Sequence, residues 1–262
     1  KKKKKKKKKK NFQLLVRRDD PIPAASDPLY PLGTPIVVCT RNDALDSVFE
    51  KTPRERRKDL VFIQNGAIQP WLAKKGIDTG DNAATQVLVF FAVSAKGEAP
   101  VDGVTDTDPQ GLTAAHGRHA ETFASRLRDC GGLSCRLMAS RSDFDAAALE
   151  KLVWISAFML VGAKHGGISV GEVESKHTAE VAELISELAA GGARALGLSE
   201  DALPPNLVEK LRAYARSVAH FPTAVKEFEW RNGWFWELSQ KSGESKDPFP
   251  VHSRLLKEVG AV

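Results

Sequence analysis

The first half of the chain alternates short apolar runs with polar, helix-like stretches. Pro35–Thr40, Leu60–Ile63 and Gln86–Ser94 are nearly continuous runs of apolar residues, and Phe12–Val16 is a further run that ends in charged residues. Runs of this kind predict strands buried on both faces, as in a parallel sheet covered by helices. Asp43–Lys51 carries its apolar residues on one face and predicts a short helix between the strands.

The second half changes period, with apolar residues recurring every three or four positions. This spacing predicts helices, over Gly111–Arg128, Asp143–Ala163, Ala179–Leu196, Asn206–Ala219 and Thr223–Gln240. Gly191-Gly192 predicts a break in the third of these segments, and Pro204-Pro205 predicts the start of the fourth. The change of period divides the chain into an α/β domain at residues 11–140 and an all-helical domain at residues 141–262.

The longest apolar stretch, Leu152–Ala163, has twelve residues and predicts a buried helix that is too short to cross a membrane. We therefore expect no transmembrane segment. Cys39, Cys130 and Cys135 form neither a disulfide framework nor a zinc quartet, and they predict a reducing compartment. Cys39 lies in an apolar run and is expected to be buried.

Charge changes this picture at the N-terminus, where residues 1–10 are all lysine. The chain has a net charge of +6, but without this run 29 Lys and Arg stand against 33 Asp and Glu, a net charge of −4. Ten like charges repel one another and predict a tail without a fold of its own. We interpret the run as an artefact or a placeholder for unread residues, with a polyanion-binding arm as the alternative. The mildly acidic body predicts no nucleic-acid partner.

Two polar sequences follow predicted strands, where open α/β sheets bind their ligands. Arg17-Arg18 directly follows the first apolar run. Arginines at the end of the second strand of a dinucleotide-binding sheet accommodate the 2′-phosphate of NADP, and the alternative is a solubilising pair. Gln64-Asn65-Gly66 ends a buried strand, where the Asn65 amide can both donate and accept hydrogen bonds. The alternative for this sequence is a simple Asn-Gly turn.

Two helical segments carry residues suited to acid–base chemistry. Lys151 lies one residue before a strongly apolar stretch, where desolvation lowers an amine pKa; the alternative is an amine that extends into solvent. Glu227 lies in His220–Trp236, a segment dense in aromatic residues and carboxylates, for which the alternative role is packing. His116 and His119 lack a third ligand nearby and predict no metal site.

The order of these sequences resembles the ketopantoate reductase family, the 2-dehydropantoate 2-reductases. The resemblance covers nearly all of residues 11–262 and is most specific at Asn65-Gly66, at Lys151 and in the KEFEWRNG sequence that ends at Gly233. The sequence segments VCTRND, EKLVWISAFMLVGA and FPTAVKEFEWRNGWF are similar to those of a poorly characterised plastid-type branch of this family in plants and algae. The resemblance implies an incomplete Rossmann-like domain, lacking its first strand and glycine-rich loop, followed by a helical domain like that of 6-phosphogluconate dehydrogenase.

The resemblance also implies a reaction, in which NADPH delivers hydride to the carbonyl of a small 2-keto acid and a helix lysine protonates the developing alkoxide. A cationic amine beside the carbonyl stabilises charge that appears only in the transition state. The implied residues are Lys151 and Glu227 for catalysis, Arg17, Arg18, Asn65 and Gly66 for the cofactor, and Thr223 and Asn232 for the substrate.

The chain also departs from the family pattern. No G-x-G-x-x-G follows a predicted strand, and the lysine run stands where that loop is expected. The family has asparagines one and two helical turns after its lysine, where this chain has Ile155 and Met159. The family also has an aspartate where this chain has Glu229. An apolar wall in place of amides argues against ketopantoate as the substrate.

Two hypotheses about function stay open. The first is an NADP-dependent reductase with an altered substrate range. The second is a non-catalytic binding or assembly subunit of a larger plastid complex. The expected location is the plastid stroma or such a complex, otherwise the cytoplasm, and the expected assembly is a homodimer or a complex with protein partners.

Overall fold

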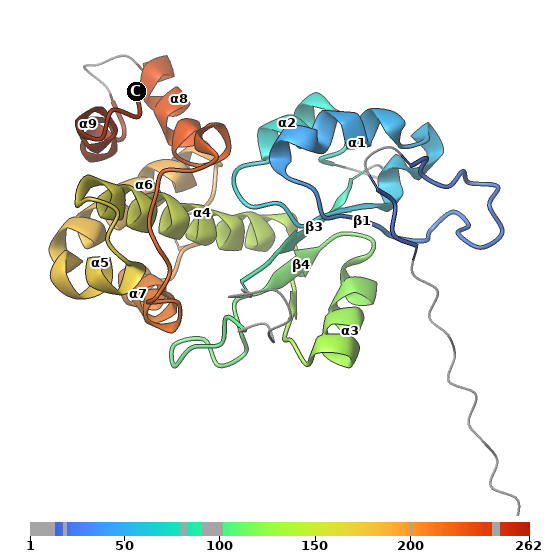
Figure 1. Ribbon diagram of the computed structural model, residues 1–262, viewed down its shortest axis with the longest axis horizontal. Helices are drawn as coiled ribbons and strands as arrows, with labels where there is room; N and C mark the ends of the chain where they lie inside the picture. The colour runs from blue at the N-terminus through green and yellow to red at the C-terminus, as the bar shows by residue number, and fades with distance from the viewer. Residues whose placement is uncertain (1–13, 18–19, 80–82, 91–101, 200, 243–246) are drawn as a thin grey trace, which may run out of the picture.

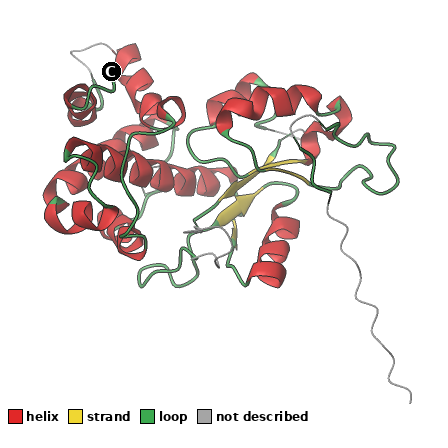
Figure 2. Cartoon of the chain, viewed as in Figure 1, coloured by secondary structure: helices red, strands yellow, loops and turns green. Residues whose placement is uncertain are grey.

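The computed structural model describes residues 14–17, 20–79, 83–90, 102–199, 201–242 and 247–262 (Figure 1). A small sheet with helices on both faces forms one part of the described chain, and a cluster of helices forms the other. Figure 2 shows the strands confined to the first part, at the right of the view. The predicted organisation, α/β first and helical afterwards, is confirmed.

The sheet has five strands in sequence order: β1 (Ile36–Val38), β2 (Leu60–Phe62), β3 (Thr85–Leu88), β4 (Ala114–His116) and β5 (Arg136–Leu137). β1, β2 and β3 are parallel, with Val37 opposite Val61 and Val61 opposite Thr85. β4 runs antiparallel to β3 and parallel to β5. The sheet is therefore mixed, and the prediction of an all-parallel sheet is wrong at β4.

Alternate residues of β2 face opposite layers of helices. Leu60 and Phe62 pack in a cluster with residues of α1 (Leu45–Lys51) and α2 (Gln69–Lys74). Val61 packs on the other face, against a cluster that includes the first residue of α3 (Ala120–Gly131). All three β2 residues are buried, as predicted for a central strand. Figure 1 shows α1 and α2 on one side of the sheet and α3 on the other.

Three predictions for the α/β part are wrong. Residues 14–16 form no strand, while Phe12 lies outside the described residues. β1 is an edge strand whose only described sheet neighbour is β2, so Val37 and Cys39 are exposed and not buried. The helix predicted from Gly111 to Arg128 begins only at Ala120, because Ala114–His116 pairs with β3.

The long central helix of the second part is α4 (Arg141–Lys164), with 24 residues. It begins where Ser140 and Asp143 form a capping box: the Asp143 N–H donates to Ser140 Oγ at 3.0 Å and the Ser140 N–H to Asp143 Oδ2 at 3.3 Å. α4 is longer than its predicted apolar run, and by length and composition it could cross a membrane. In the structure 78% of its apolar window is buried inside the protein, as in a core helix.

Further helices surround α4: α5 (Val170–Lys176), α6 (Thr178–Ala195), α7 (Leu207–Ser217), α8 (Asn232–Ser242) and α9 (Pro250–Glu258). α6 runs unbroken through Gly191-Gly192, so the predicted break is wrong. A Cβ on Gly191 would lie 2.1 Å from the ring of Phe249. Gly191 therefore lets the segment at Phe249 approach the helix closely.

The predicted helix from Thr223 to Gln240 is also wrong in its first half. This part forms neither helix nor strand until a 3-10 turn, η4 (Phe228–Trp230), which precedes α8. The Trp230 carbonyl accepts a hydrogen bond from the Ala67 N–H at 2.7 Å. A contact with the α/β part therefore replaces the helical bond that the periodicity predicts.

A buried ion cluster joins the loop before β4 to the helices. Lys210 of α7 binds Glu150 of α4 at 2.7 Å and Asp108 at 3.4 Å. Burial raises the pKa of Glu150, while the Lys210 ammonium opposes that rise. Beside this cluster, the ring of Tyr214 contacts Phe90 and Trp154 edge-on. The charged and aromatic contacts together fix α4 against the end of β3.

Candidate active site

The carboxyl ends of β1 and β2 are tied together by the side chain of Gln64. Its Nε2 donates to the carbonyls of Val38 at 2.9 Å and Thr40 at 3.0 Å. The amide of the buried Asn42 donates to the Asn65 carbonyl at 2.8 Å. These bonds hold the Gln64-Asn65-Gly66 turn at the edge where open α/β sheets bind ligands, and they leave the Asn65 side chain exposed.

Lys151 projects from α4 toward the neighbouring strand end. Its Nζ donates to the Val89 carbonyl, directly after β3, and lies 4.7 Å from the centre of the Phe90 ring. Lys151 is 7% exposed. Burial and, to a smaller extent, the charge of Arg231 lower its pKa to about 7. Such an amine can both give and take a proton at neutral pH.

Glu227 and Arg231 are the third group of residues in the site, after the Gln64-Asn65-Gly66 turn and Lys151. The Arg231 guanidinium pairs with the Glu227 carboxylate, and burial lowers the pKa of Arg231 although Glu227 opposes this. The Arg231 Nε is buried without a hydrogen-bond partner among the described residues. Glu227 is the one non-glycine residue of the described chain with a positive φ, +48°. Strained backbone of this kind gathers at ligand sites.

The turn at Asn65-Gly66 and the segment from Glu227 to Arg231 touch directly. Gly66 has φ +96°, and a Cβ there would lie 2.2 Å from the Trp230 carbonyl oxygen. The next residue, Ala67, donates its N–H to that same oxygen. The structure therefore gathers Asn65-Gly66, Lys151 and Glu227 around one edge of the sheet, although they lie far apart in the sequence.

The other predicted site residues lie elsewhere or in structural contacts. The buried Asn232 holds His252 Nε2 at 2.9 Å through its Oδ1, and the buried Thr223 donates from Oγ1 to the Ile168 carbonyl at 2.5 Å. Arg17 is exposed, and its N–H donates to Asp20. Arg18 lies outside the described residues. The roles of these four residues stay predictions.

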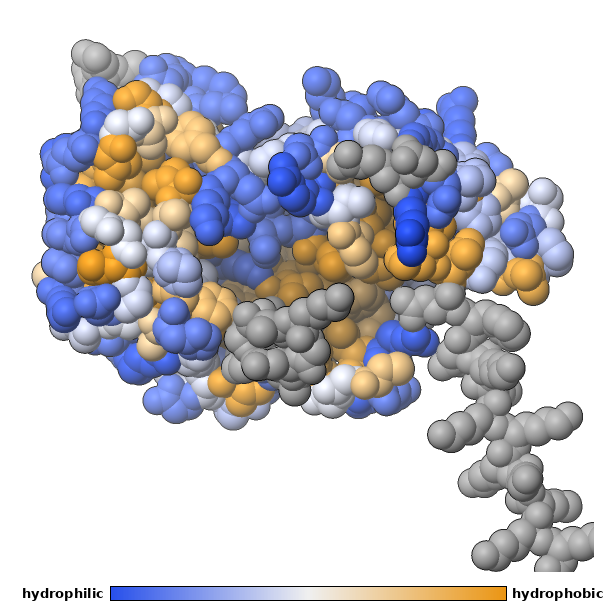
Figure 3. Space-filling view, viewed as in Figure 1, coloured by the Kyte–Doolittle hydropathy of each residue, from blue (hydrophilic) through white to orange (hydrophobic). Residues whose placement is uncertain are grey.

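A cavity of about 270 Å³ lies beside the site, between α2, α4 and α8. Gly66 and Ala67 line it together with Leu149, Leu152 and Trp234. Lys151 is absent from its walls because its amine extends to Val89 and Phe90. Figure 3 shows in addition an apolar hollow on the viewed face, between the helical and the α/β parts.

Arg231 is the site residue that sequence reasoning missed. It lies between Glu227 and Asn232, at a position to which the resemblance assigns no role. A signal was present, since a cation four residues after a carboxylate is spaced for an ion pair. The structure adds what spacing cannot, namely that this cation acts on the buried amine of Lys151.

The fold and this edge define a two-part architecture, in which a helical region presents a lysine to the carboxyl ends of a Rossmann-like sheet. Solved structures share the fold. The 2-dehydropantoate 2-reductase from Methylococcus capsulatus is 20% identical, with 86% of this chain and 72% of that chain covered and a TM-score of 0.61. A D-mandelate dehydrogenase in complex with NADH is 13% identical, with 86% and 77% covered and a TM-score of 0.60.

A PanE/ApbA family ketopantoate reductase from Ralstonia eutropha JMP134 is 14% identical, with 88% of this chain and 77% of that chain covered and a TM-score of 0.59. No family model matches the sequence, and no curated protein matches it. At these identities the likeness establishes the fold, and the predicted fold class is confirmed.

Proposed function

We propose that this protein is a nicotinamide-dependent reductase of 2-keto acids, related to the ketopantoate reductases. The observation that carries the proposal is the buried amine of Lys151, with a pKa of about 7, at the carboxyl end of β3. A general acid works best when its pKa lies near the working pH. Structural neighbours named as ketopantoate reductases and as an NADH-bound dehydrogenase support the same chemistry.

The residues present fit the nicotinamide end of such a cofactor. The buried Gln64 Oε1 has no hydrogen-bond partner in the described chain, and the exposed Asn65 side chain lies next to it at the sheet edge. An acceptor without a partner, beside an exposed side-chain amide, can form hydrogen bonds with the carboxamide and ribose of a nicotinamide nucleotide. When bound there, the cofactor supplies the hydride.

Lys151 donates the proton in the proposed reduction. Its Nζ is held by the Val89 carbonyl and excluded from water, so its positive charge is stabilised mainly when negative charge develops on the substrate oxygen. Phe90 fixes the amine further by a cation–π contact at 4.7 Å. The chain thus holds one proton, at Nζ, beside the edge where the carbonyl is expected.

The charges of the site favour an anionic substrate. Lys151 and Arg231 bring two cations together, and among the described residues Glu227 is the carboxylate paired with Arg231. The carboxylate of a 2-keto acid restores the balance and offers an acceptor to the orphaned Arg231 Nε. We include NADP as the cofactor, with Arg17 as a ligand of its 2′-phosphate, and a plastid location as the finer part of the proposal.

A second candidate function is that of a non-catalytic subunit of a larger assembly. The observation that favours it is the face of α4 above Lys151, where Ile155 is 8% exposed and Met159 packs against the same apolar core. This face offers a substrate no amide. Reduction by the purified protein distinguishes the two functions.

The cofactor is tested by titrating the protein with NADPH and following its tryptophan fluorescence, since the chain has five tryptophans. We expect saturable quenching, weakened by Arg17→Glu because a carboxylate repels the 2′-phosphate, and NADH binding that this substitution leaves unchanged. The matched control is Arg254→Glu, at an exposed arginine of α9. Absence of saturable NADPH binding contradicts the proposal.

The pH dependence of the reduction tests the role of Arg231. Because the Arg231 charge lowers the pKa of Lys151, Arg231→Gln is expected to raise that pKa. The reduction needs the protonated amine, so the pH at which its rate falls moves upward from about 7. The measurement is kcat as a function of pH, with Arg254→Gln as the control. An unchanged or lowered midpoint contradicts the assignment.

A further inference from the structure

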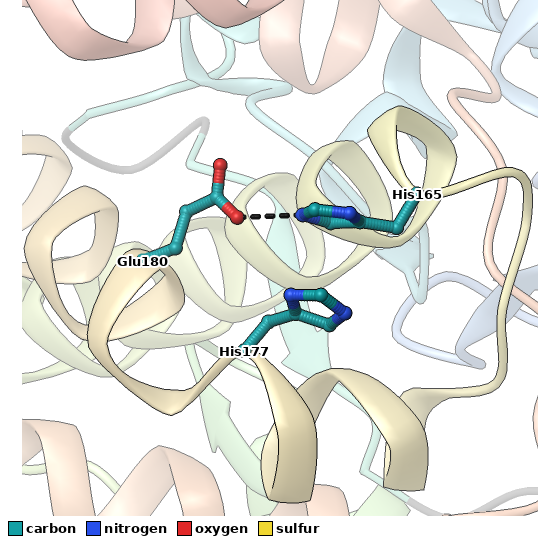
Figure 4. A group of neighbouring side chains, drawn as sticks. All are labelled: His165, His177 and Glu180. Carbon is teal, nitrogen blue, oxygen red and sulfur yellow. Dashed lines mark hydrogen bonds and ion pairs between the residues drawn. The ribbon is translucent and has the colours of Figure 1, made fainter.

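Two histidines and a glutamate meet at the far end of α4, where three helices join (Figure 4). His165 caps the C-terminus of α4, His177 lies between α5 and α6, and Glu180 is in the first turn of α6. Their candidate ligand atoms all lie within 4.8 Å of one another. His165 Nε2 is 2.7 Å from Glu180 Oε2, and the two imidazole rings stack with centroids 3.6 Å apart.

Ordinary ion pairing accounts for part of this arrangement. Glu180 pairs with Lys164 through Oε1 at 2.7 Å and with His165 through Oε2. It does not account for His177, whose ring has no hydrogen-bond partner among the described residues and lies flat against His165. A metal ion bound by a nitrogen of each ring explains their proximity.

The donor set and its dimensions suit a zinc ion. Zinc takes imidazole nitrogen and carboxylate oxygen in a tetrahedron with bonds of roughly 2.0–2.2 Å, which places ligand atoms about 3.3 Å apart. In this cluster His165 Nε2 and Glu180 Oε2 are 2.7 Å apart and no pair of ligand atoms is more than 4.8 Å apart, so small movements bring the atoms to that spacing. The rings must turn so that their lone pairs converge, and torsions between sp³ and sp² atoms are soft.

The surroundings also favour a cation. The C-terminus of the 24-residue helix α4 ends at this cluster, so its partial negative charge adds to that of Glu180, while the N-terminus of α6 at His177 opposes it. Lys164 opposes a metal ion, but it holds the other carboxylate oxygen and has a second partner in Glu258 at 3.1 Å. All three side chains are half-buried, which leaves a fourth position open to water.

We propose that His165, His177 and Glu180 form a zinc site that fastens the ends of α4, α5 and α6. The site is separate from the proposed reduction, because His165 follows Lys151 by 14 positions, about 21 Å along the helix. Zinc here binds the folded chain and not the unfolded one, so it stabilises the helical region by mass action. The role is structural and does not depend on the proposed function.

The test is calorimetric titration of the protein with zinc chloride. Cys39 and Cys130 are exposed thiols, and thiols can bind zinc. All variants in the titration therefore carry serine at both positions. We expect one zinc per chain. His177→Asn is expected to weaken binding by more than about tenfold, since even outer-shell partners of metal ligands have effects of that size. His220→Asn, at an exposed histidine, is the matched control and leaves binding unchanged.

Two further measurements make the outcome decisive. Cobalt(II) bound at the site is expected to give the intense visible absorption of tetrahedral coordination, and Glu180→Gln is expected to remove it. Zinc is expected to raise the melting temperature of the control but not of His177→Asn, with both compared to their own metal-free state. Absence of zinc binding, or equal binding by the control and both ligand variants, overturns the proposal. Neither readout involves reductase activity.

Discussion

Replacement of Lys151 by methionine is expected to abolish reduction and at the same time to stabilise the protein. Methionine fills a similar volume beside Phe90, but it carries no proton for the substrate oxygen, so kcat falls by about a thousandfold. The buried amine is costly, since burial lowers its pKa from 10.5 to about 7. Its removal raises the free energy of unfolding by about 1–3 kcal/mol near pH 6, after loss of the hydrogen bond to Val89.

The stability gained by Lys151→Met is expected to depend on pH, because the folded and unfolded chains release the Lys151 proton at different pH values. The unfolded chain keeps Lys151 protonated up to pH 10.5, whereas the folded chain releases the proton near pH 7. Between these values the unfolded state binds more protons, so the stability of the native sequence rises with pH. The advantage of Lys151→Met is therefore full below pH 7 and disappears toward pH 10.5.

Chemical unfolding at several pH values measures this effect, and kcat with 2-keto acids measures the loss of activity. Lys257→Met, at an exposed lysine of α9, is the control and changes neither quantity. Equal stability of Lys151→Met and the native sequence at pH 6 shows that the amine is hydrated and not desolvated. Retained turnover removes Lys151 from the mechanism.

Replacement of Gly66 by alanine is expected to destabilise the protein by about 2–4 kcal/mol, from backbone strain and steric overlap together. The new Cβ would lie 2.2 Å from the Trp230 carbonyl oxygen, and φ is +96°. Relief of the overlap separates the turn from the segment that carries Glu227 and Arg231. Activity is therefore expected to fall further than the fraction of folded protein.

Gly76→Ala separates the two causes. Gly76 has φ +65° and no atom within 4 Å of a Cβ, so alanine there incurs the backbone cost alone, about 1 kcal/mol. Urea unfolding of both variants gives the difference. If Gly66→Ala costs no more than Gly76→Ala, the contact with Trp230 does not hold the two segments together.

Sequence patterns predicted the elements in which neighbouring residues decide the structure. Leu60–Phe62 is apolar at every position and forms a central strand, and α4 and α6 follow their helical period. β4 was missed because the small residues of Ala114–His116 carry no strand period, and pairing with β3 determines their conformation. The segment from Thr223 has a helical period, yet it forms no helix before Phe228, and its Trp230 carbonyl bonds the Ala67 N–H instead.

The candidate site was predictable where a residue type carries its own chemistry. An isolated lysine at the edge of an apolar helix, and an Asn-Gly pair after a strand, are visible in a single sequence. The charge of Arg231 beside Lys151, and the approach of His177 to His165, depend on how distant segments pack. Periodicity within one segment contains no information about such contacts.

The bond between Ala67 and Trp230 also bears on how the protein is made. A ribosome releases the sheet edge with Gln64 long before the chain that carries Glu227 and Arg231 has left the exit tunnel. Closing so long a loop is slow and follows the formation of local structure. A nascent or truncated chain therefore has the lysine helix and the strand ends without the arginine, and the site becomes complete only when synthesis has passed Trp230.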